Sequence, residues 1–291
     1  MRERKGLITI SGLILSVLLS VSGYAETSVW KATKNGETVY FGGTVHLLRP
    51  TDYPLPEAYE TAYQASDALY FETDIRGMSD MSVQARMLGQ LTYQDGRTLT
   101  SVLSEDVYQQ LRDYAESVGL PMAMMQTFKP GLLITTLQLL EFQKLGFTPQ
   151  GVDAFFDSRA MGDGKSIGQF ETVDEQIGFL SRMGEGIEDE FVALSLADME
   201  KIEQSMDQMI QAWRSGDVNA LEAQFVTDMK NNYPQVYKDL LLDRNNRWMP
   251  QVESLFKNEE TEFVLVGAAH LVGEDGLIEQ LAAKGYEVAQ L

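Results

Sequence analysis

Residues 38–46 read Thr38-Val-Tyr-Phe-Gly-Gly-Thr-Val-His46, and residues 263–270 read Phe263-Val-Leu-Val-Gly-Ala-Ala-His270. In each stretch an apolar run typical of a buried strand leads to a glycine, and a histidine follows three residues after that glycine. His46 and His270 are the two histidines of the chain. Side chains that follow buried strands collect at the carboxyl edge of an open α/β sheet, where such sheets bind ligands. We therefore predict that His46 and His270 share one site.

Strand signals frame the chain at both ends. Asn35-Gly36 lies between two β-prone runs and predicts a hairpin that leads into the first histidine stretch. Further apolar runs predict strands over residues 68–71, 165–170 and 286–289. From about residue 95 to 255 the periodicity is helical, and helices are expected over residues 104–119, 130–145, 153–161, 188–214 and 234–256. We predict an α/β fold with a mixed central sheet built from the N- and C-terminal parts of the chain. A large helical insertion, over about residues 100–255, should cover the site.

The first 25 residues form a separate signal. Basic residues near the start precede an apolar stretch over residues 7–21, and the small-residue pattern Gly23-Tyr24-Ala25 follows. This order is typical of a secretory signal peptide, and the apolar stretch is short for a membrane span. An uncleaved anchor is the alternative. We expect cleavage after Ala25, a periplasmic or secreted protein, and a single domain over residues 26–291.

Composition excludes several classes of partner. The formal net charge is −20, and residues 1–25 carry three positive charges against one negative, so cleavage would leave −22. Such an acidic chain repels phosphate backbones and anionic lipids, so we expect no nucleic acid and, after cleavage, no membrane partner. The chain has no cysteine, which excludes disulfides and thiolate sites. Nothing in the sequence specifies an oligomeric state.

Four polar residues each close an apolar run: His46, Glu72, Glu171 and His270. If the strands are parallel, these residues meet at one rim. Two histidines and a carboxylate can hold a divalent ion with an open position for water. Alternatively, a histidine can act as general base with a carboxylate orienting it, and no metal is needed. Glu72 can also be a solvated strand end, and Glu171 can belong to the helix cap that follows it.

Methionines offer a second candidate metal site. Met199, Met206 and Met209 have spacings that place them on one face of a helix, and thioethers bind copper in exported proteins. Packing is the preferred interpretation, because methionine fills apolar cores. The sequence contains neither the HExxH nor the GxSxG pattern of the common zinc proteases and serine hydrolases.

Taken together, these residues resemble the TraB/GumN family, which also includes the pheromone-shutdown protein PrgY and the animal Tiki proteases. The resemblance covers nearly all of residues 26–291. It rests on Gly43-Thr44-Val45-His46-Leu47, Tyr70-Phe71-Glu72, Gly151-Val152-Asp153, Gly168-Gln169-Phe170-Glu171-Thr172 with Gln176, Arg244-Asn245, and Gly267-Ala268-Ala269-His270-Leu271. It implies a fold similar to that of the erythromycin esterases and the haem-binding ChaN proteins.

The same resemblance implies a metal-dependent peptidase activity, as in the Tiki members. Carried over by motif, the two GxxH histidines and the intervening glutamate are His46, His270 and Glu72, with Arg244 and Asn245 as further site residues. On this hypothesis the histidines and Glu72 bind Mn²⁺, Co²⁺ or Zn²⁺ and activate water against a peptide or ester carbonyl.

In that hydrolase, Arg244 would stabilise the oxyanion, and Glu72 or Glu171 would move the proton. The alternatives are a protein that binds a peptide or haem without turning it over, and a metal-independent, esterase-like hydrolase. The expected partner is a peptide or small-molecule substrate.

Overall fold

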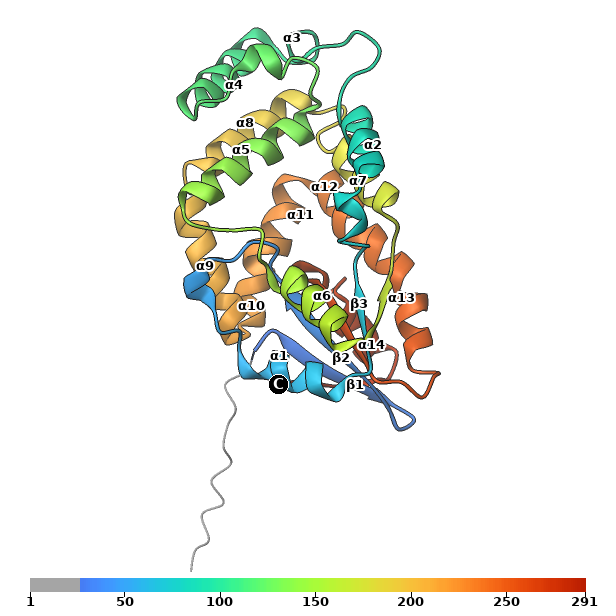
Figure 1. Cartoon of the computed structure of the whole chain (residues 1–291). Helices are drawn as coiled ribbons and strands as arrows, with labels where there is room; N and C mark the ends of the chain where they lie inside the picture. Colours follow the sequence, from blue (N-terminus) through green and yellow to red (C-terminus); the bar gives the residue numbers. More distant parts are fainter. Residues whose placement is uncertain (1–26) are drawn as a thin grey trace, which may run out of the picture.

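The two histidine stretches follow neighbouring strands of one six-stranded sheet in the computed structural model, which describes residues 27–291 (Figure 1). β2 (Glu37–Thr44) pairs in parallel with β5 (Glu262–Gly267), so that Thr44 lies opposite Gly267. The expected signal peptide at residues 1–25 lies outside the described residues.

The sheet is mixed, as predicted. Its strand order is β4-β3-β5-β2-β1-β6. β3 (Ala68–Phe71) and β4 (Ser166–Gln169) extend the parallel part, whereas β1 (Val29–Lys34) and β6 (Glu287–Gln290) pair antiparallel. The N- and C-terminal parts of the chain therefore interleave, because β5 inserts between β2 and β3. This arrangement confirms the α/β fold class.

Local chemistry explains the strands that carry the histidines. The β1–β2 hairpin turns at Asn35 and Gly36, whose φ angles of 56° and 95° are those of the tight turn this dipeptide favours. β5 is buried at every position from Glu262 to Val266. Since successive side chains of a strand point to opposite faces, helices must cover both faces of the sheet here.

The helices fill the sequence between the strands. They are α1 (Glu57–Ala65), α2 (Met81–Leu91), α3 (Leu99–Val102), α4 (Glu105–Ser117), α5 (Pro130–Lys144), α6 (Val152–Asp163), α7 (Val173–Arg182), α8 (Glu188–Met199), α9 (Ile202–Ser215), α10 (Val218–Leu221), α11 (Asp228–Asn232), α12 (Pro234–Tyr237), α13 (Asp243–Leu255) and α14 (Leu277–Ala283). Two π-helical segments, Glu222–Thr227 and Lys238–Leu242, join α10 to α11 and α12 to α13. In these two segments, before α11 and after α12, the backbone hydrogen bonds join residues five apart instead of the four of an α-helix.

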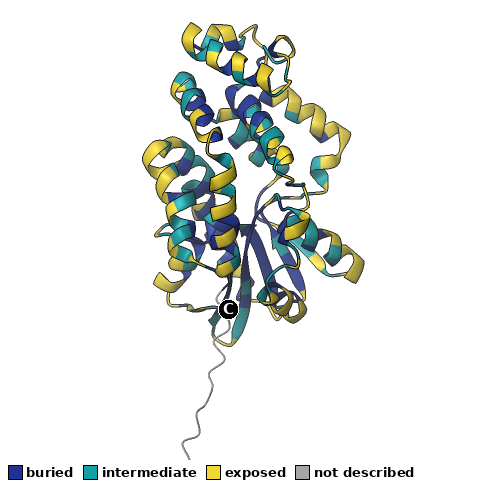
Figure 2. Ribbon diagram, turned by 90° about the vertical axis from the view of Figure 1, so that its left-hand side faces the viewer, coloured by how far each residue is buried: buried dark blue, intermediate teal, exposed yellow. Residues whose placement is uncertain are grey.

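The helical part extends away from the sheet and has a core of its own. In Figure 1, α3, α4, α5 and α8 lie at the end of the molecule remote from the strands. Leu133 and Leu137 of α5 pack there with Phe191 and Val192 of α8. The main core instead joins the sheet to α1, α6, α9 and α13. Figure 2 shows the strands buried and the outer faces of the helices exposed.

Two details differ from the sequence-based expectation. The expected helix over 188–214 is two helices, because Met199 packs in the remote core and Met209 in the main core, and the chain changes direction between them. α2 lies outside the stretch predicted to be helical. It buries only Val83 and Leu91, too few apolar residues for a periodic signal.

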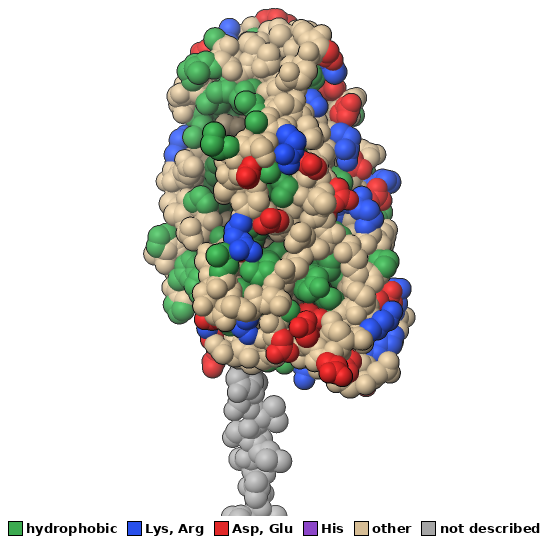
Figure 3. Space-filling model, turned by 45° about the vertical axis from the view of Figure 1, so that its right-hand side comes forward, with side chains coloured by type: hydrophobic (Ala, Val, Ile, Leu, Met, Phe, Trp, Pro, Cys, Tyr) green, Lys and Arg blue, Asp and Glu red, His purple; other side chains and the backbone are tan. Residues whose placement is uncertain are grey.

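The surface of the described chain is mixed in charge on the face drawn in Figure 3. Acidic and basic side chains alternate along its right-hand side, and apolar side chains gather at the upper left. Over residues 27–291, no helix combines the length and apolarity needed to cross a membrane.

Candidate active site

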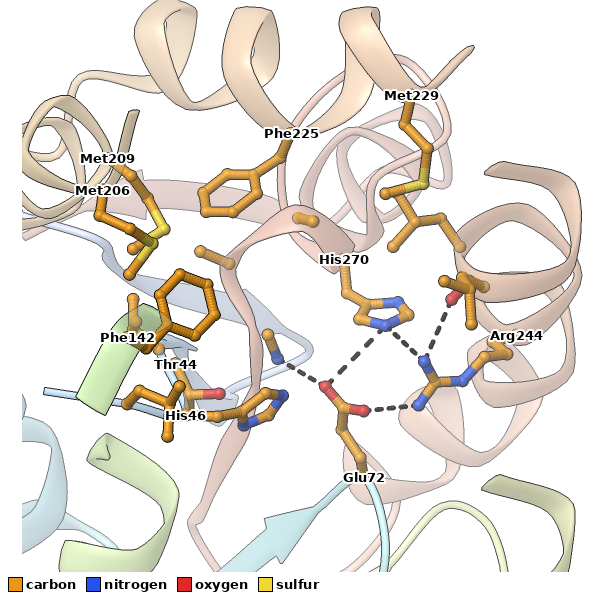
Figure 4. Close-up of a pocket in the computed structure, with 17 residues that line it drawn as sticks. Thr44, His46, Glu72, Phe142, Met206, Met209, Phe225, Met229, Arg244 and His270 are labelled. Carbon is orange, nitrogen blue, oxygen red and sulfur yellow. Dashed lines mark hydrogen bonds and ion pairs between the residues drawn. The ribbon is translucent and has the colours of Figure 1, made fainter. Parts of the chain in front are cut away.

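The carboxyl ends of β2, β3 and β5 bring three predicted site residues to one cavity. His46, Glu72 and His270 all line it, together with Arg244, and its volume is about 360 Å³ (Figure 4). Glu171 and Asn245 lie behind this wall and reach it through Arg244 and His270. The parallel pairing of β2 with β5 and of β5 with β3 is the reason the strand ends coincide.

His270 is buried and fixed in one tautomer. The side-chain amide of Asn245 donates to the backbone carbonyls of His270 and Asp275, at 3.2 and 2.8 Å, so its oxygen faces the imidazole. Nδ1 of His270 donates to that oxygen at 2.6 Å. Nε2 therefore carries a lone pair and accepts from Arg244 Nη1 at 3.1 Å. Burial lowers the pKa of His270 to about 3, so this imidazole stays neutral.

Glu72 is a buried carboxylate with several donors. Its Oε1 accepts the backbone N–H of Gly267 at 2.7 Å, and its Oε2 accepts from Arg244 Nη2 and, at 3.3 Å, from Gln176. Burial by itself would raise the pKa of Glu72, but the Arg244 charge, the two histidines and the Gly267 N–H together outweigh it and hold the pKa well below its usual range. A Cβ at position 267 would lie 3.1 Å from Oε1, so glycine leaves room for this carboxylate.

Arg244 joins the two carboxylates. It donates to Glu171 through Nε at 3.1 Å and Nη2 at 2.7 Å, and Trp248 adds a bond to Glu171 at 3.3 Å. Arg244 and Trp248 lie one turn apart on α13, whose next turns bury Val252 and Leu255 in the core. Burial raises the pKa of Glu171, and Arg244 opposes that shift. Two carboxylates facing one guanidinium leave the cluster with an excess of negative charge, which favours a further cation.

His46 has a different environment. Its side chain is 63% exposed, and its Nδ1 lies 3.1 Å from Asp153 Oδ1 at the start of α6. The Asp153 charge raises the pKa of His46, although solvent at the exposed ring screens the pair. A Cβ at Gly151 would lie 2.3 Å from the His46 backbone, so only glycine allows α6 to approach this closely.

A second cavity adjoins the first. Thr44, His46 and Glu72 line both, and the second, of about 300 Å³, also contacts Thr73 and Asp153. The hydroxyls of Thr44 and Thr73 are buried without a hydrogen-bond partner among residues 27–291. The His46–Glu72 wall thus separates a largely apolar space from a more polar one.

Sequence reasoning missed three contacts of this site. Asp153, Gln176 and Trp248 each hold a site residue, and the first two lie within the quoted family motifs, which were the available signal. Beyond Glu72 the chain turns, and Asp74 accepts the backbone N–H of Gly77.

Comparison with known proteins identifies the family of the chain. The model of the TraB/PrgY/gumN family matches residues 28–290. The chain belongs to this family. No solved structure shows significant similarity to the chain.

The curated relatives of this family member are named metalloproteases. Metalloprotease TIKI1 of Xenopus tropicalis is 24% identical, with 86% of this chain and 58% of the relative aligned. Metalloprotease TIKI2 of Danio rerio is 22% identical, with 86% and 57% aligned. The chain thus spans less than two thirds of the length of these relatives.

The residues of this TraB/PrgY/gumN chain fit a divalent ion in donor type and orientation. Both imidazoles bind an outer oxygen through Nδ1, from Asp153 for His46 and from Asn245 for His270, so Nε2 is the nitrogen that each could offer to an ion. Ligating histidines in proteins are oriented in this way.

Two features limit that fit. His270 Nε2 and Glu72 Oε1 lie 3.9 Å apart, and residues 27–291 hold no ready-made cluster of three or more such ligands. Arg244 also bonds to Nε2, so an ion would need Arg244 to release that lone pair.

Proposed function

We propose that this protein is an exported metal-dependent hydrolase that acts as a peptidase. The observation that carries the proposal is the pair of imidazoles beside Glu72 in one cavity, each with Nδ1 engaged by an outer oxygen. Metalloprotease relatives and the excess negative charge of the buried cluster support the same function.

His46, His270 and Glu72 would hold the ion, which is Mn²⁺, Co²⁺ or Zn²⁺. When bound, such an ion supplies a Lewis acid that polarises a carbonyl and lowers the pKa of water. Asn245 keeps His270 in the tautomer that ligation requires, and Asp153 orients His46.

Arg244 and the two carboxylates have distinct parts in this proposal. Glu171 holds the guanidinium of Arg244 in a bidentate pair, and that guanidinium lines the cavity. A fixed cation there stabilises negative charge that develops on a carbonyl oxygen. Glu72 lines the cavity and stays ionised, which suits a ligand of a cation, whereas Glu171 acts as a positioning residue through Arg244.

The test measures metal content and turnover together. Wild type, His46→Ala, His270→Ala and Glu72→Gln are equilibrated with Mn²⁺, Co²⁺ or Zn²⁺ and assayed on a peptide and ester panel with and without chelator. Glu259→Gln, at an exposed position, is the matched control for Glu72→Gln. We expect the three site variants to lose metal and turnover and the control to keep both. Full turnover after exhaustive chelation, or wild-type metal content in the double histidine variant, would refute the proposal.

One observation favours a second candidate. His46 and Asp153 form an imidazole–carboxylate pair whose imidazole is exposed, the arrangement of a general base with its orienting acid. In a metal-independent hydrolase built on this pair, Asp153→Asn would remove most turnover while chelators would have no effect. Chelation therefore separates the two candidates.

Export is part of the proposal and rests on the pattern of residues 1–25. N-terminal sequencing of the protein recovered from the cell envelope or medium should begin near Glu26. Recovery with Met1 in the cytoplasmic fraction would contradict it.

A further inference from the structure

The cavity of about 360 Å³ has two chemically different ends. The polar end is the candidate site. The other end is made by side chains of α5, α9, α11 and the first π-helical segment, and Phe142, Met206, Phe225 and Met229 represent them (Figure 4). These four large apolar side chains are only half-buried. Their remaining surface faces a concave space, so a ligand that covers it gains the free energy of apolar burial.

The apolar end offers nothing to a charged ligand group. Apart from the two histidines, the ionisable residues lining the cavity are Glu72 and Arg244, and they pair with each other. A cationic or anionic side chain placed among these methionines and phenylalanines would lose its hydration without gaining a partner. The chemistry of the wall therefore selects for an apolar group.

The size of the cavity suits a large apolar group. A cavity of about 150 Å³ lined by Leu, Ile and Phe accepts benzene, and this cavity is more than twice as large. The two π-helical segments contribute Phe225, Leu240 and Leu241 to its wall, and such segments are frequent at functional sites. Met206 and Met229 can adjust to the shape of the group, because methionine has three flexible bonds.

We propose that this apolar end is a specificity pocket for a large apolar side chain, aromatic or aliphatic, of the substrate peptide. The inference rests on the proposed hydrolase function and adds its substrate class. The pocket is continuous with His46, Glu72 and His270, so a peptide whose apolar side chain fills it presents an adjacent carbonyl to those residues.

Binding of single-residue probes tests the pocket without turnover. N-acetyl-L-phenylalaninamide, N-acetyl-L-leucinamide, N-acetylglycinamide and N-acetyl-L-lysinamide are titrated into the purified chain in chelator and followed by NMR. We expect the phenylalanine and leucine amides to bind at least about tenfold more tightly than the glycine amide. Equal affinities for the phenylalanine and glycine amides would overturn the inference.

A charge reversal sharpens the test. In the double variant Met206→Glu, Met229→Glu we expect about tenfold weaker binding of the phenylalanine amide and tighter binding of the lysine amide than of the phenylalanine amide. Met81→Glu, at an 84% exposed methionine on α2, is the control and should bind as wild type. A double variant that keeps the wild-type preference would overturn the inference.

A milder variant covers the case in which the double variant does not fold. Phe225→Ala enlarges the pocket without adding charge, so N-acetyl-L-tryptophanamide should gain affinity relative to the phenylalanine amide. An unchanged ratio would count against the pocket. Apolar binding without hydrolysis of any peptide would refute the proposed function alone. Hydrolysis with equal kcat/KM for glycine and phenylalanine peptides would refute the specificity pocket alone.

Discussion

The two GxxH stretches have the same spacing and equivalent places at the ends of paired strands, yet their histidines have opposite environments. His270 is 4% exposed, and its two ring nitrogens are bonded to Asn245 and Arg244. His46 is 63% exposed and has one bond, to Asp153. Burial lowers the pKa of His270, and a neighbouring carboxylate raises that of His46.

This difference shows that a motif places a side chain while its neighbours decide its chemistry. The loop after β2 packs against the N-terminus of α6, where Val152 N–H donates to the Val45 carbonyl, and Leu48 forms a β-bridge with Thr148. The segment after β5 lies against α13, which supplies Arg244, Asn245 and Trp248. The part of the site around His270 is therefore preorganised within the core, whereas the part around His46 is exposed to solvent.

The largest expected effect comes from removing the cation of the buried half. Arg244→Met leaves the carboxylates of Glu72 and Glu171 buried without their partner, and we expect a loss of about 3–5 kcal/mol in the free energy of unfolding. Urea denaturation at pH 7 measures it. Arg247→Met, on the same helix but 47% exposed and 4.0 Å from Glu171, should cost less than about 1 kcal/mol. Equal losses of unfolding free energy in Arg244→Met and Arg247→Met would contradict the view that the His270 side of the site is part of the core.

The histidines themselves should differ next. His270→Ala leaves the buried side-chain oxygen of Asn245 without a donor and removes one acceptor of Arg244 Nη1, at a cost of roughly 1–3 kcal/mol. His46→Ala removes an exposed ring and should change the free energy of unfolding by less than about 0.5 kcal/mol. Thermal melts of the two variants in chelator provide the measurement. A larger loss of unfolding free energy in His46→Ala than in His270→Ala would show that His46 contributes to the core.

The next prediction concerns the pH dependence of the two histidines, which has the smallest effect on stability and the clearest effect on ionisation. In chelator, NMR should find His46 titrating above the ordinary imidazole pKa of 6.5 and His270 far below it. The raised pKa of His46 stabilises the fold below pH 6.5, and this contribution is lost as the pH rises through the folded pKa. The lowered pKa of His270 has the opposite sign, so it reduces stability as the pH falls below 6.5.

Asp153→Asn isolates the cause of the raised pKa. Without the carboxylate the pKa of His46 should fall to 6.5 or below, and that of His270 should stay where it is. The change in the free energy of unfolding should be under about 1 kcal/mol, because the pair is exposed on one side. A joint shift of both histidines would mean that the two halves are electrostatically coupled more strongly than their contacts indicate.

Particular residues show how much of the structure could be predicted from the sequence. The strand signals before Gly43 and Gly267, the Asn35-Gly36 turn and the polar residues after each apolar run were sufficient to predict the mixed sheet and the residues at its rim. Strand and turn preferences act over a few neighbouring residues, so they can be predicted from the sequence alone.

Tertiary structure alone decided the rest. Asp153 reaches His46 across 107 residues of sequence, and Arg244 reaches Glu72 across 172, so no local pattern could reveal that one histidine is paired with an acid and the other faces a guanidinium. The apolar pocket beside them likewise gathers side chains from α5, α9 and two π-helical segments. Burial and charge are properties of the packed surroundings of a residue, and those surroundings exist only once distant segments have come together.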